Sequence, residues 1–145
     1  MSVSKLAAIF SQYGNVNLRS WRLALSGATL AWMGLIFYLS SLSQDEVPTA
    51  SWLGAWQSYL GHIFLYGVLA ALTELSLWGW NSGYQIRWVL IAAVAATLYG
   101  VSDEFHQSFV AGRTATIKDV LVDTAAAIAA SAILWLVATH WKRYA

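Results

Sequence analysis

The chain has 145 residues, the length of a single domain, with 59% hydrophobic residues, 10% charged residues and a net charge of +1. A typical soluble domain carries about 25% charged residues, so this composition excludes an ordinary soluble fold and indicates an integral membrane protein. The chain has no Cys, which excludes disulfides and thiolate metal sites.

Four apolar segments are long enough to cross a membrane as helices, which requires about 20 residues each. In chain order they are about Leu23–Leu42, Ala55–Trp78, Ile86–Phe105 and Ile117–Thr139. The expected fold class is therefore all-α, an integral membrane bundle of four transmembrane helices. Residues 1–20 have mixed polarity and lack a small-residue cleavage site after a short apolar run. We therefore expect a cytoplasmic or interfacial N-terminal segment over 1–20 and a transmembrane domain over 21–142.

Charged side chains divide between the two ends of the predicted bundle. The end that carries both termini has six basic residues, namely Lys5, Arg19, Arg22, Arg87, Lys142 and Arg143. The opposite end has two basic residues, Arg113 and Lys118, and six acidic ones, namely Asp45, Glu46, Asp103, Glu104, Asp119 and Asp123. Because basic residues concentrate in cytoplasmic loops, both termini are expected in the cytoplasm. The polar segment 99–123 is then expected to face outside.

Small residues recur within three of the predicted spans. They are Gly27, Ala31 and Gly34 in the first span, Ala92 and Ala96 in the third, and Ala125–Ala127, Ala129 and Ala130 in the fourth. In lipid, small residues let helix backbones approach closely. These positions are therefore expected to pack inside the bundle.

Polar residues gather near the outer ends of the second, third and fourth spans. Three sets have helical spacing, which puts each set on one helix face, and they are Tyr99, Asp103, His106 and Gln107; His62 and Tyr66; and Asp119 and Asp123. The short loop 108–116 makes the last two spans neighbours and brings Arg113 close to the helix ends. Three helices are therefore expected to bring polar groups together at a similar depth.

Several of these residues also have structural interpretations. Thr116 and Asp119 resemble a capping box, with Asp where Glu or Gln is usual. Arg113 can neutralise Asp103 or Asp119 in a bidentate pair that pins the loop, and a pinned Arg can still receive a phosphate. His62 can be a hydrogen-bond partner between two helices.

Catalytic chemistry and metal binding are both open to the cluster. Acid–base catalysis would pair His106 or His62 with Asp103 or Glu104. A metal site has permissible ligands in Asp103, Glu104, His106 and Asp119, but their spacing matches no standard metal pattern. Because of this spacing we expect no metal, and we expect no cofactor either.

Recognition of an anionic headgroup is a third possibility for the cluster. Arg113 and Lys118 supply positive charge, and the amino end of the fourth span supplies N–H groups. Because acids outnumber bases here, such a ligand must also offer hydrogen-bond donors, such as sugar hydroxyls or amines.

One run of polar motifs resembles the signature of the VanZ-like membrane family. The motifs are Asp103-Glu104-Phe105-His106-Gln107, Gly112-Arg113-Thr114 and Asp119-Val120. The resemblance extends to Phe37-Tyr38-Leu39-Ser40-Ser41 at the end of the first span and to His62 with Tyr66 in the second. It covers roughly residues 30–135 and implies a small multi-span protein of the bacterial envelope. The naming member of the family is linked to low-level resistance to teicoplanin, a lipoglycopeptide that binds cell-wall precursors.

The chain departs from the family pattern at three positions. Ala111 stands where the family usually has Pro, Asp123 stands where it commonly has Asn, and the family commonly has Gly near the position of Ala126. The missing proline makes the loop less rigid, and Asp123 adds an acid to the site. Neither the missing proline nor Asp123 removes a charged position of the motif.

The residues and the resemblance together predict a multi-pass protein of the bacterial cytoplasmic (inner) membrane. Its outward-facing polar site is expected to bind a lipid-linked or amphiphilic envelope ligand, such as a lipid-linked cell-wall precursor. Membrane lipids are expected partners and nucleic acid is not. The alternatives are a membrane-embedded acid–base enzyme acting on a lipid-linked envelope substrate, and a non-catalytic structural or partner-binding protein. The residues expected to carry any catalysis are His106, Asp103, Glu104 and His62, and those expected to bind the ligand are Arg113, Asp119, Gln107, Asp123 and Tyr66.

Overall fold

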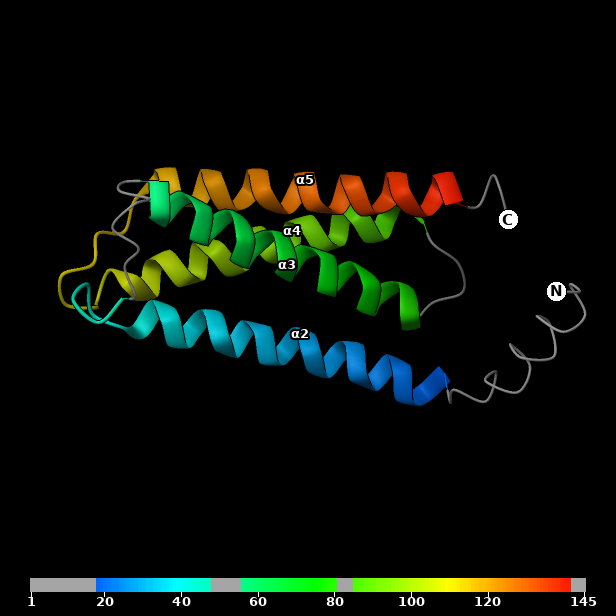
Figure 1. Cartoon of the computed structure of the whole chain (residues 1–145), viewed down its shortest axis with the longest axis horizontal. Helices are drawn as coiled ribbons and strands as arrows, with labels where there is room; N and C mark the ends of the chain where they lie inside the picture. The colour runs from blue at the N-terminus through cyan, green and yellow to red at the C-terminus, as the bar shows by residue number, and fades with distance from the viewer. Residues whose placement is uncertain (1–17, 48–55, 81–84, 142–145) are drawn as a thin grey trace, which may run out of the picture.

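A computed structural model describes residues 18–47, 56–80 and 85–141. These residues form four α-helices and no strand, with the bounds α2 (Leu18–Ser41), α3 (Trp56–Trp80), α4 (Ile86–Gln107) and α5 (Ile117–Trp141). Each helix is long and apolar enough to cross a membrane, so the predicted all-α fold with four spans is confirmed. Successive helices run in opposite directions, so α2 begins at the end of the bundle where α5 finishes (Figure 1). Lys5, Lys142 and Arg143 lie outside the described residues.

Two helices extend beyond the predicted apolar spans, because the helical backbone continues into polar residues. Helix α2 begins at Leu18, within the segment assigned to the cytoplasm or interface. Residues 18–22 contain neither Gly nor Pro, so nothing in them interrupts the backbone hydrogen bonds. Helix α4 continues to Gln107, past the predicted end at Phe105. The polar residues of α4 are therefore held on a regular helix rather than on a loop.

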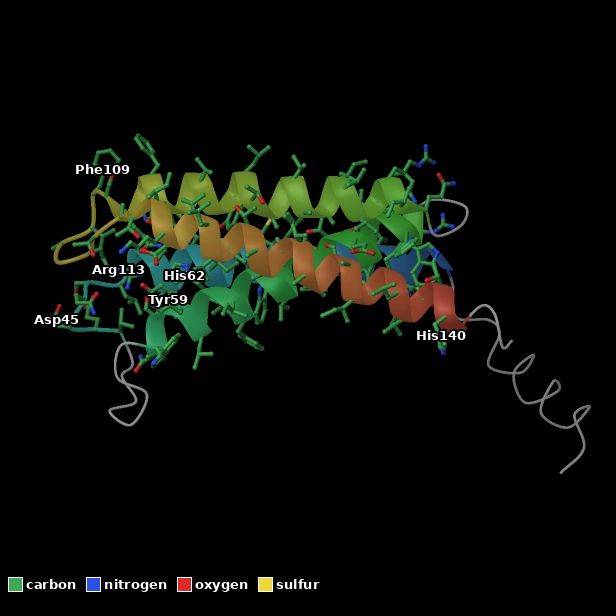
Figure 2. The ribbon with its side chains drawn as sticks, turned by 90° about the horizontal axis from the view of Figure 1, so that it is seen from above. Asp45, Tyr59, His62, Phe109, Arg113 and His140 are labelled. Atoms are coloured by element: carbon green, nitrogen blue, oxygen red, sulfur yellow. The ribbon has the colours of Figure 1, made fainter. Side chains whose placement is uncertain are left out.

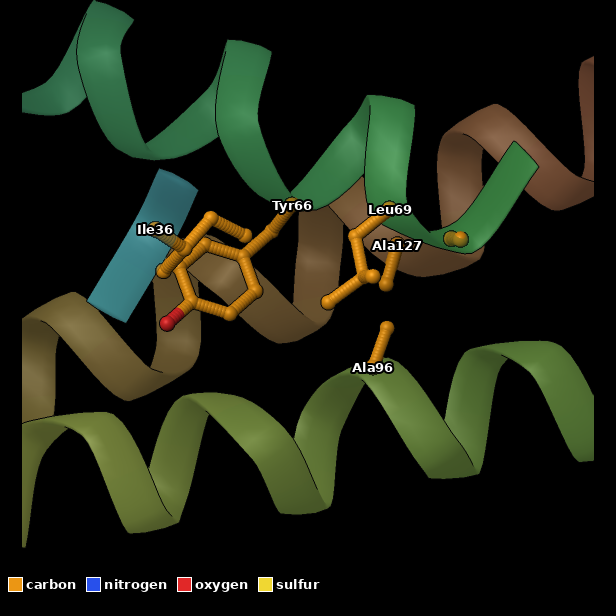
Figure 3. Close-up of a cluster of buried hydrophobic side chains, with 6 residues drawn as sticks. Ile36, Tyr66, Leu69, Ala96 and Ala127 are labelled. Carbon is orange, nitrogen blue, oxygen red and sulfur yellow. The ribbon is translucent and has the colours of Figure 1, made fainter. Parts of the chain in front are cut away.

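Helix α3 occupies the centre of the arrangement and contacts each of the other three helices. Its most extensive contacts are with α5, whereas α2 packs on α3, touches α4 briefly and makes no contact with α5 within the described residues. One buried apolar cluster joins the four helices, and it consists of Ile36, Tyr66, Leu69, Ala70, Ala96 and Ala127 (Figure 3). The alanines of α4 and α5 let these helices approach α3 closely, as expected for packing in lipid.

The predicted packing of small residues inside the bundle is confirmed in α4 and is wrong in α2. In α5 it is correct for Ala126 and Ala127 and wrong for Ala125 and Ala129, which are exposed. Ala92, Ala96 and Ala127 are buried in the bundle. Gly27 and Gly34 are exposed, and a Cβ built on either would meet no atom within 4 Å. Spacing places small residues on one helix face, but it does not decide whether that face meets another helix or lipid.

Hydrogen bonds from aromatic side chains hold α2 against its two neighbours. The Tyr99 hydroxyl of α4 donates to the Met33 carbonyl oxygen at 2.7 Å. The Trp32 indole N–H of α2 donates to the Leu65 carbonyl oxygen of α3 at 2.9 Å. Interhelical hydrogen bonds in membranes contribute about 0.6 kcal/mol each. They therefore add direction to a contact that apolar packing alone would leave free to slide.

Two loops meet at the end of the bundle where α4 finishes. A Cβ on Gly112 would lie 3.2 Å from the Gln44 Cβ, so loop 108–116 touches the turn that follows α2. In that turn the Ser43 backbone N–H and hydroxyl donate to the Glu46 carboxylate at 3.0 and 2.7 Å. These hydrogen bonds hold the pKa of Glu46 below its usual value. The two loops lie beside the polar residues predicted to form the site.

Candidate functional site

Three helices bring ionisable side chains together near one end of the bundle. His62 of α3, Glu104 of α4 and Asp123 of α5 each place a possible ligand atom within 4.8 Å of the others. In Figure 2, His62 and Arg113 lie toward the same end of the molecule as Asp45, and His140 lies at the other. The predicted convergence of three helices is thus present. We call His62, Glu104 and Asp123 the inner triad of this cluster.

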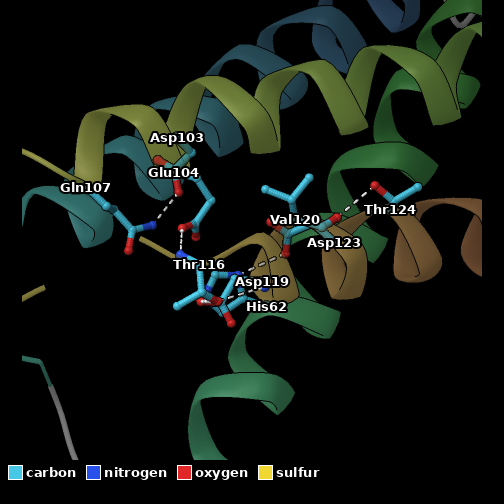
Figure 4. Close-up of polar contacts among 9 residues, drawn as sticks. All are labelled: His62, Asp103, Glu104, Gln107, Thr116, Asp119, Val120, Asp123 and Thr124. Atoms are coloured by element: carbon cyan, nitrogen blue, oxygen red, sulfur yellow. Dashed lines mark hydrogen bonds and ion pairs between the residues drawn. The ribbon is translucent and has the colours of Figure 1, made fainter. Parts of the chain in front are cut away.

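His62 and Asp123 form a buried contact between α3 and α5. The His62 Nδ1 lies 2.9 Å from the Asp123 Oδ1, and the Asp123 side chain is only 1% exposed (Figure 4). The other carboxylate oxygen of Asp123, Oδ2, is buried and has no hydrogen-bond partner. The helix–helix interpretation of His62 is therefore correct, but its partner is an acid with an unused oxygen.

Glu104 connects α4 to the beginning of α5. Its Oε2 accepts a hydrogen bond from the Thr116 backbone N–H at 2.9 Å (Figure 4). Glu104 is 6% exposed, and its Oε1 is buried without a partner. The carboxylate is thus fixed at one oxygen and leaves the other available.

Thr116 and Asp119 form the capping contact that their spacing predicted. The Thr116 hydroxyl donates to the Asp119 Oδ2 at 2.8 Å, and the Asp119 backbone N–H is 3.3 Å from the Thr116 Oγ1. In a standard capping box the acidic side chain would accept the backbone N–H of the capping residue. Here Glu104 accepts that N–H instead, so the cap of α5 is shared between two helices.

Asp103 and Gln107 form a pair within α4, next to Tyr66 of α3. The Gln107 Nε2 donates to the Asp103 Oδ2 at 2.8 Å, while the Asp103 Oδ1 is buried without a partner. The buried Tyr66 hydroxyl also lacks a hydrogen-bond partner. Its ring stacks near that of His62, with 6.2 Å between centroids. Polar atoms without hydrogen-bond partners therefore continue from the inner triad along α3 and α4.

His106 lies apart from the inner triad and faces α2. Its Nε2 is 3.0 Å from the Ser41 Oγ, and its ring stacks on Phe37 with centroids 4.6 Å apart. His106 follows Glu104 by two residues, which is a rotation of about 200° around the helix. The two side chains therefore point to different neighbours, and His62, not His106, is the histidine beside buried carboxylates.

Arg113 stands on the loop without an ionic partner. The predicted bidentate pair with Asp103 or Asp119 does not form, because no carboxylate of the described residues lies within ion-pair distance of Arg113. The Arg113 Nε is buried and has no hydrogen-bond partner. Gly112 beside it has a φ of 73°, a conformation that favours glycine. The turn at Gly112 thus presents a cation at the edge of an acidic cluster.

Two features of the site are beyond what sequence spacing can reveal. The clamp on Glu104 is a backbone N–H, which no residue type signals. A Cβ on Gly100 would lie 3.1 Å from the Asp123 Oδ2, so the absence of a side chain there makes room for the acid. The four-residue interval between Gly100 and Glu104 places both on one face of α4, but it does not indicate which helix that face meets.

Comparison with known proteins supports the resemblance carried by the polar motifs. The family model described as VanZ/LLP1 matches residues 25–138. No curated protein and no solved structure matches the chain significantly. The matched segment includes His62, Glu104, Arg113 and Asp123, and most of all four helices. The chain therefore belongs to the VanZ/LLP1 family.

Proposed function

We propose that this protein binds the anionic headgroup of a lipid-linked or amphiphilic ligand of the bacterial envelope at the polar end of its bundle. The observation that supports this function is the Arg113 guanidinium, which has no ionic partner within the described residues. A guanidinium stays charged and matches phosphate or carboxylate in a two-point contact. Arg113 is therefore the group that would receive the anion.

A neighbouring acid suits the uncharged part of such a ligand. The free oxygen of Asp103 can accept a hydrogen bond from a hydroxyl or amine group. On the lipid-facing side, Phe105 and Phe109 are exposed and pack edge to face at 5.1 Å. A ligand with an anionic group, a hydrogen-bond donor and an apolar chain would satisfy all three environments.

The orientation of the site follows from the distribution of basic residues. Arg22 and Arg87 belong to the end of the bundle opposite the candidate site. The positive-inside rule then puts that end in the cytoplasm and the candidate site on the outer side of the cytoplasmic membrane. Lipid-linked wall precursors are exposed on that side. The link to lipoglycopeptides that the family resemblance implies is consistent with a ligand of this class.

Native mass spectrometry of the purified full chain tests headgroup binding. We expect wild type to retain a co-purified anionic lipid, and Arg113→Ala to lose it while keeping its melting temperature within a few degrees. Arg87→Ala is the matched control, because it removes an exposed cation from the other end of the bundle. Equal retention of lipid by wild type and Arg113→Ala would show the proposal to be wrong.

The contact between His62 and Asp123 favours a second function, acid–base catalysis on the same class of ligand. A carboxylate 2.9 Å from Nδ1 orients an imidazole and stabilises its protonated form. The base would then be His62, since His106 pairs with Ser41. Incubation with a polyprenyl-phosphate-linked wall precursor should give a product that His62→Ala abolishes and His106→Ala preserves. Absence of any conversion by wild type would leave ligand binding without catalysis.

A further inference from the structure

We infer that His62, Glu104 and Asp123 form a binding site for one divalent transition-metal ion. The three residues come from three different helices, and their ligand atoms lie within 4.8 Å of one another. This inference goes beyond headgroup binding and does not depend on Arg113. Figure 4 shows the three side chains converging between α3, α4 and α5.

Unused oxygen atoms on both acids are the second observation that points to a ligand. The Glu104 Oε1 and the Asp123 Oδ2 are buried without hydrogen-bond partners, on residues that are 6% and 1% exposed. A buried carboxylate oxygen without a partner is costly. The His62 imidazole can neutralise only one of the two carboxylates. A bound dication would satisfy both oxygens and balance both charges.

The distances suit a metal ion after small side-chain rotations. Two ligands that each lie about 2.1 Å from a common ion are separated by about 3.0–3.4 Å at coordination angles of 90–109°. The His62 Nδ1 and the Asp123 Oδ1 are 2.9 Å apart and share a hydrogen bond, whose proton would be released to solvent when the metal binds. The Glu104 carboxylate needs to approach them, and its Oε2 is held by the Thr116 N–H. Ligating carboxylates usually have such a second hydrogen bond, which fixes their orientation.

The donor set indicates which metals would bind. One imidazole nitrogen with two carboxylate oxygens suits Zn²⁺ or Mn²⁺, whereas Mg²⁺ and Ca²⁺ prefer oxygen ligands alone. Three protein ligands also leave at least one coordination position for water. We expect Zn²⁺ to bind most tightly of the four. It generally binds nitrogen and oxygen ligands more tightly than Mn²⁺ does, and the imidazole disfavours Mg²⁺ and Ca²⁺.

Zn²⁺ binding by the tag-free full chain in detergent tests the inference. Elemental analysis should find close to one transition-metal ion per wild-type chain, and competition with a chromophoric chelator should give the Zn²⁺ affinity. We expect Glu104→Gln to weaken that affinity at least 100-fold, more than the about 10–100-fold typical of outer-shell changes. Asp103→Asn is the matched control, a neighbouring buried acid on the same helix, and should change it less than tenfold.

A second measurement keeps the inference testable if Glu104→Gln does not fold. Co²⁺ added to wild type should give intense visible absorption from a site of four or five ligands, which Zn²⁺ should displace. Wild type that binds neither ion, or Glu104→Gln and wild type with equal Zn²⁺ affinity, would overturn the metal site. Arg113→Ala should keep its Zn²⁺ while losing lipid, so failure of metal binding and failure of headgroup binding are separable.

Discussion

Gly100 is the point at which α4 comes closest to Asp123 and Tyr66. A Cβ at this position would lie 3.1 Å from the Asp123 Oδ2 and 3.3 Å from the Tyr66 Cε1. Neither neighbour can move away easily, because each side chain is only 1% exposed. The glycine is therefore required for close approach in the site, whereas a Cβ on Gly27, Gly34 or Gly61 would meet nothing within 4 Å.

We expect Gly100→Ala to destabilise the protein although alanine is the better helix former. Overpacking a tight site costs about 1–3 kcal/mol, and the gain in helix propensity returns only about 0.8–1.0 kcal/mol. The melting temperature in detergent should fall, and Zn²⁺ binding should weaken because the Asp123 carboxylate must move.

Gly34→Ala provides the control for this substitution. Gly34 is helical and exposed, and a Cβ there would meet nothing within 4 Å. Its melting temperature should stay equal or rise. If the two variants melt alike, the close contact at Gly100 does not limit packing.

At the scale of elements, the beginning of α5 depends on α4 as well as on its own cap. Thr116 exchanges two hydrogen bonds with Asp119 through its hydroxyl, and its backbone N–H is bound by Glu104. A helix start fixed in this way keeps Asp119 and Asp123 in register with α3. The loop before it can then present Arg113 without contributing to the rigidity of the site.

Thr116→Val removes the hydroxyl and preserves the shape of the side chain. Loss of an N-cap hydroxyl costs about 0.5–2 kcal/mol, so amide hydrogen exchange should rise in the first turn of α5. Thr124→Val is the control, because its hydroxyl bonds the Val120 carbonyl oxygen inside the same helix. Unchanged exchange in Thr116→Val would mean that the Glu104 contact alone holds this helix end.

For the whole molecule, the alternation of the four helices separates two kinds of charge. The end with the start of α2 and the finish of α5 includes Arg22 and Arg87, whereas Asp45, Glu46 and the candidate site belong to the other. Basic residues near the ends of the spans are retained in the cytoplasm, whereas acidic residues contribute little to orientation. This asymmetry, and not the net charge of +1, sets the expected orientation.

Reporter fusions test that orientation. A reporter attached after Ala145 should be active only in its cytoplasmic form, and one inserted at Asp45 only in its exported form. The opposite pattern would place the candidate site in the cytoplasm and refute an outer-leaflet ligand. It would leave Zn²⁺ binding by His62, Glu104 and Asp123 unaffected.

The sequence alone determined the fold class, the number of spans and the region where polar side chains gather. Long apolar runs can satisfy their backbone only as helices in lipid, and short loops force neighbouring helices to be antiparallel. The family motif and the clustering of polar residues identified segment 99–123 together with His62. These features are local, so composition and spacing are sufficient to predict them.

Only the tertiary structure decided which polar groups meet. His62, Glu104 and Asp123 lie on three helices whose rotations about their own axes are fixed by packing, so no interval in the sequence relates them. The same rotations turn His106 toward Ser41 and leave Gly34 exposed, against expectation. A spacing pattern predicts which residues share a face of one helix. It does not predict how several helices are rotated relative to one another, and that rotation decides which faces meet. That rotation depends on contacts such as the one at Gly100, which exist only in the folded bundle.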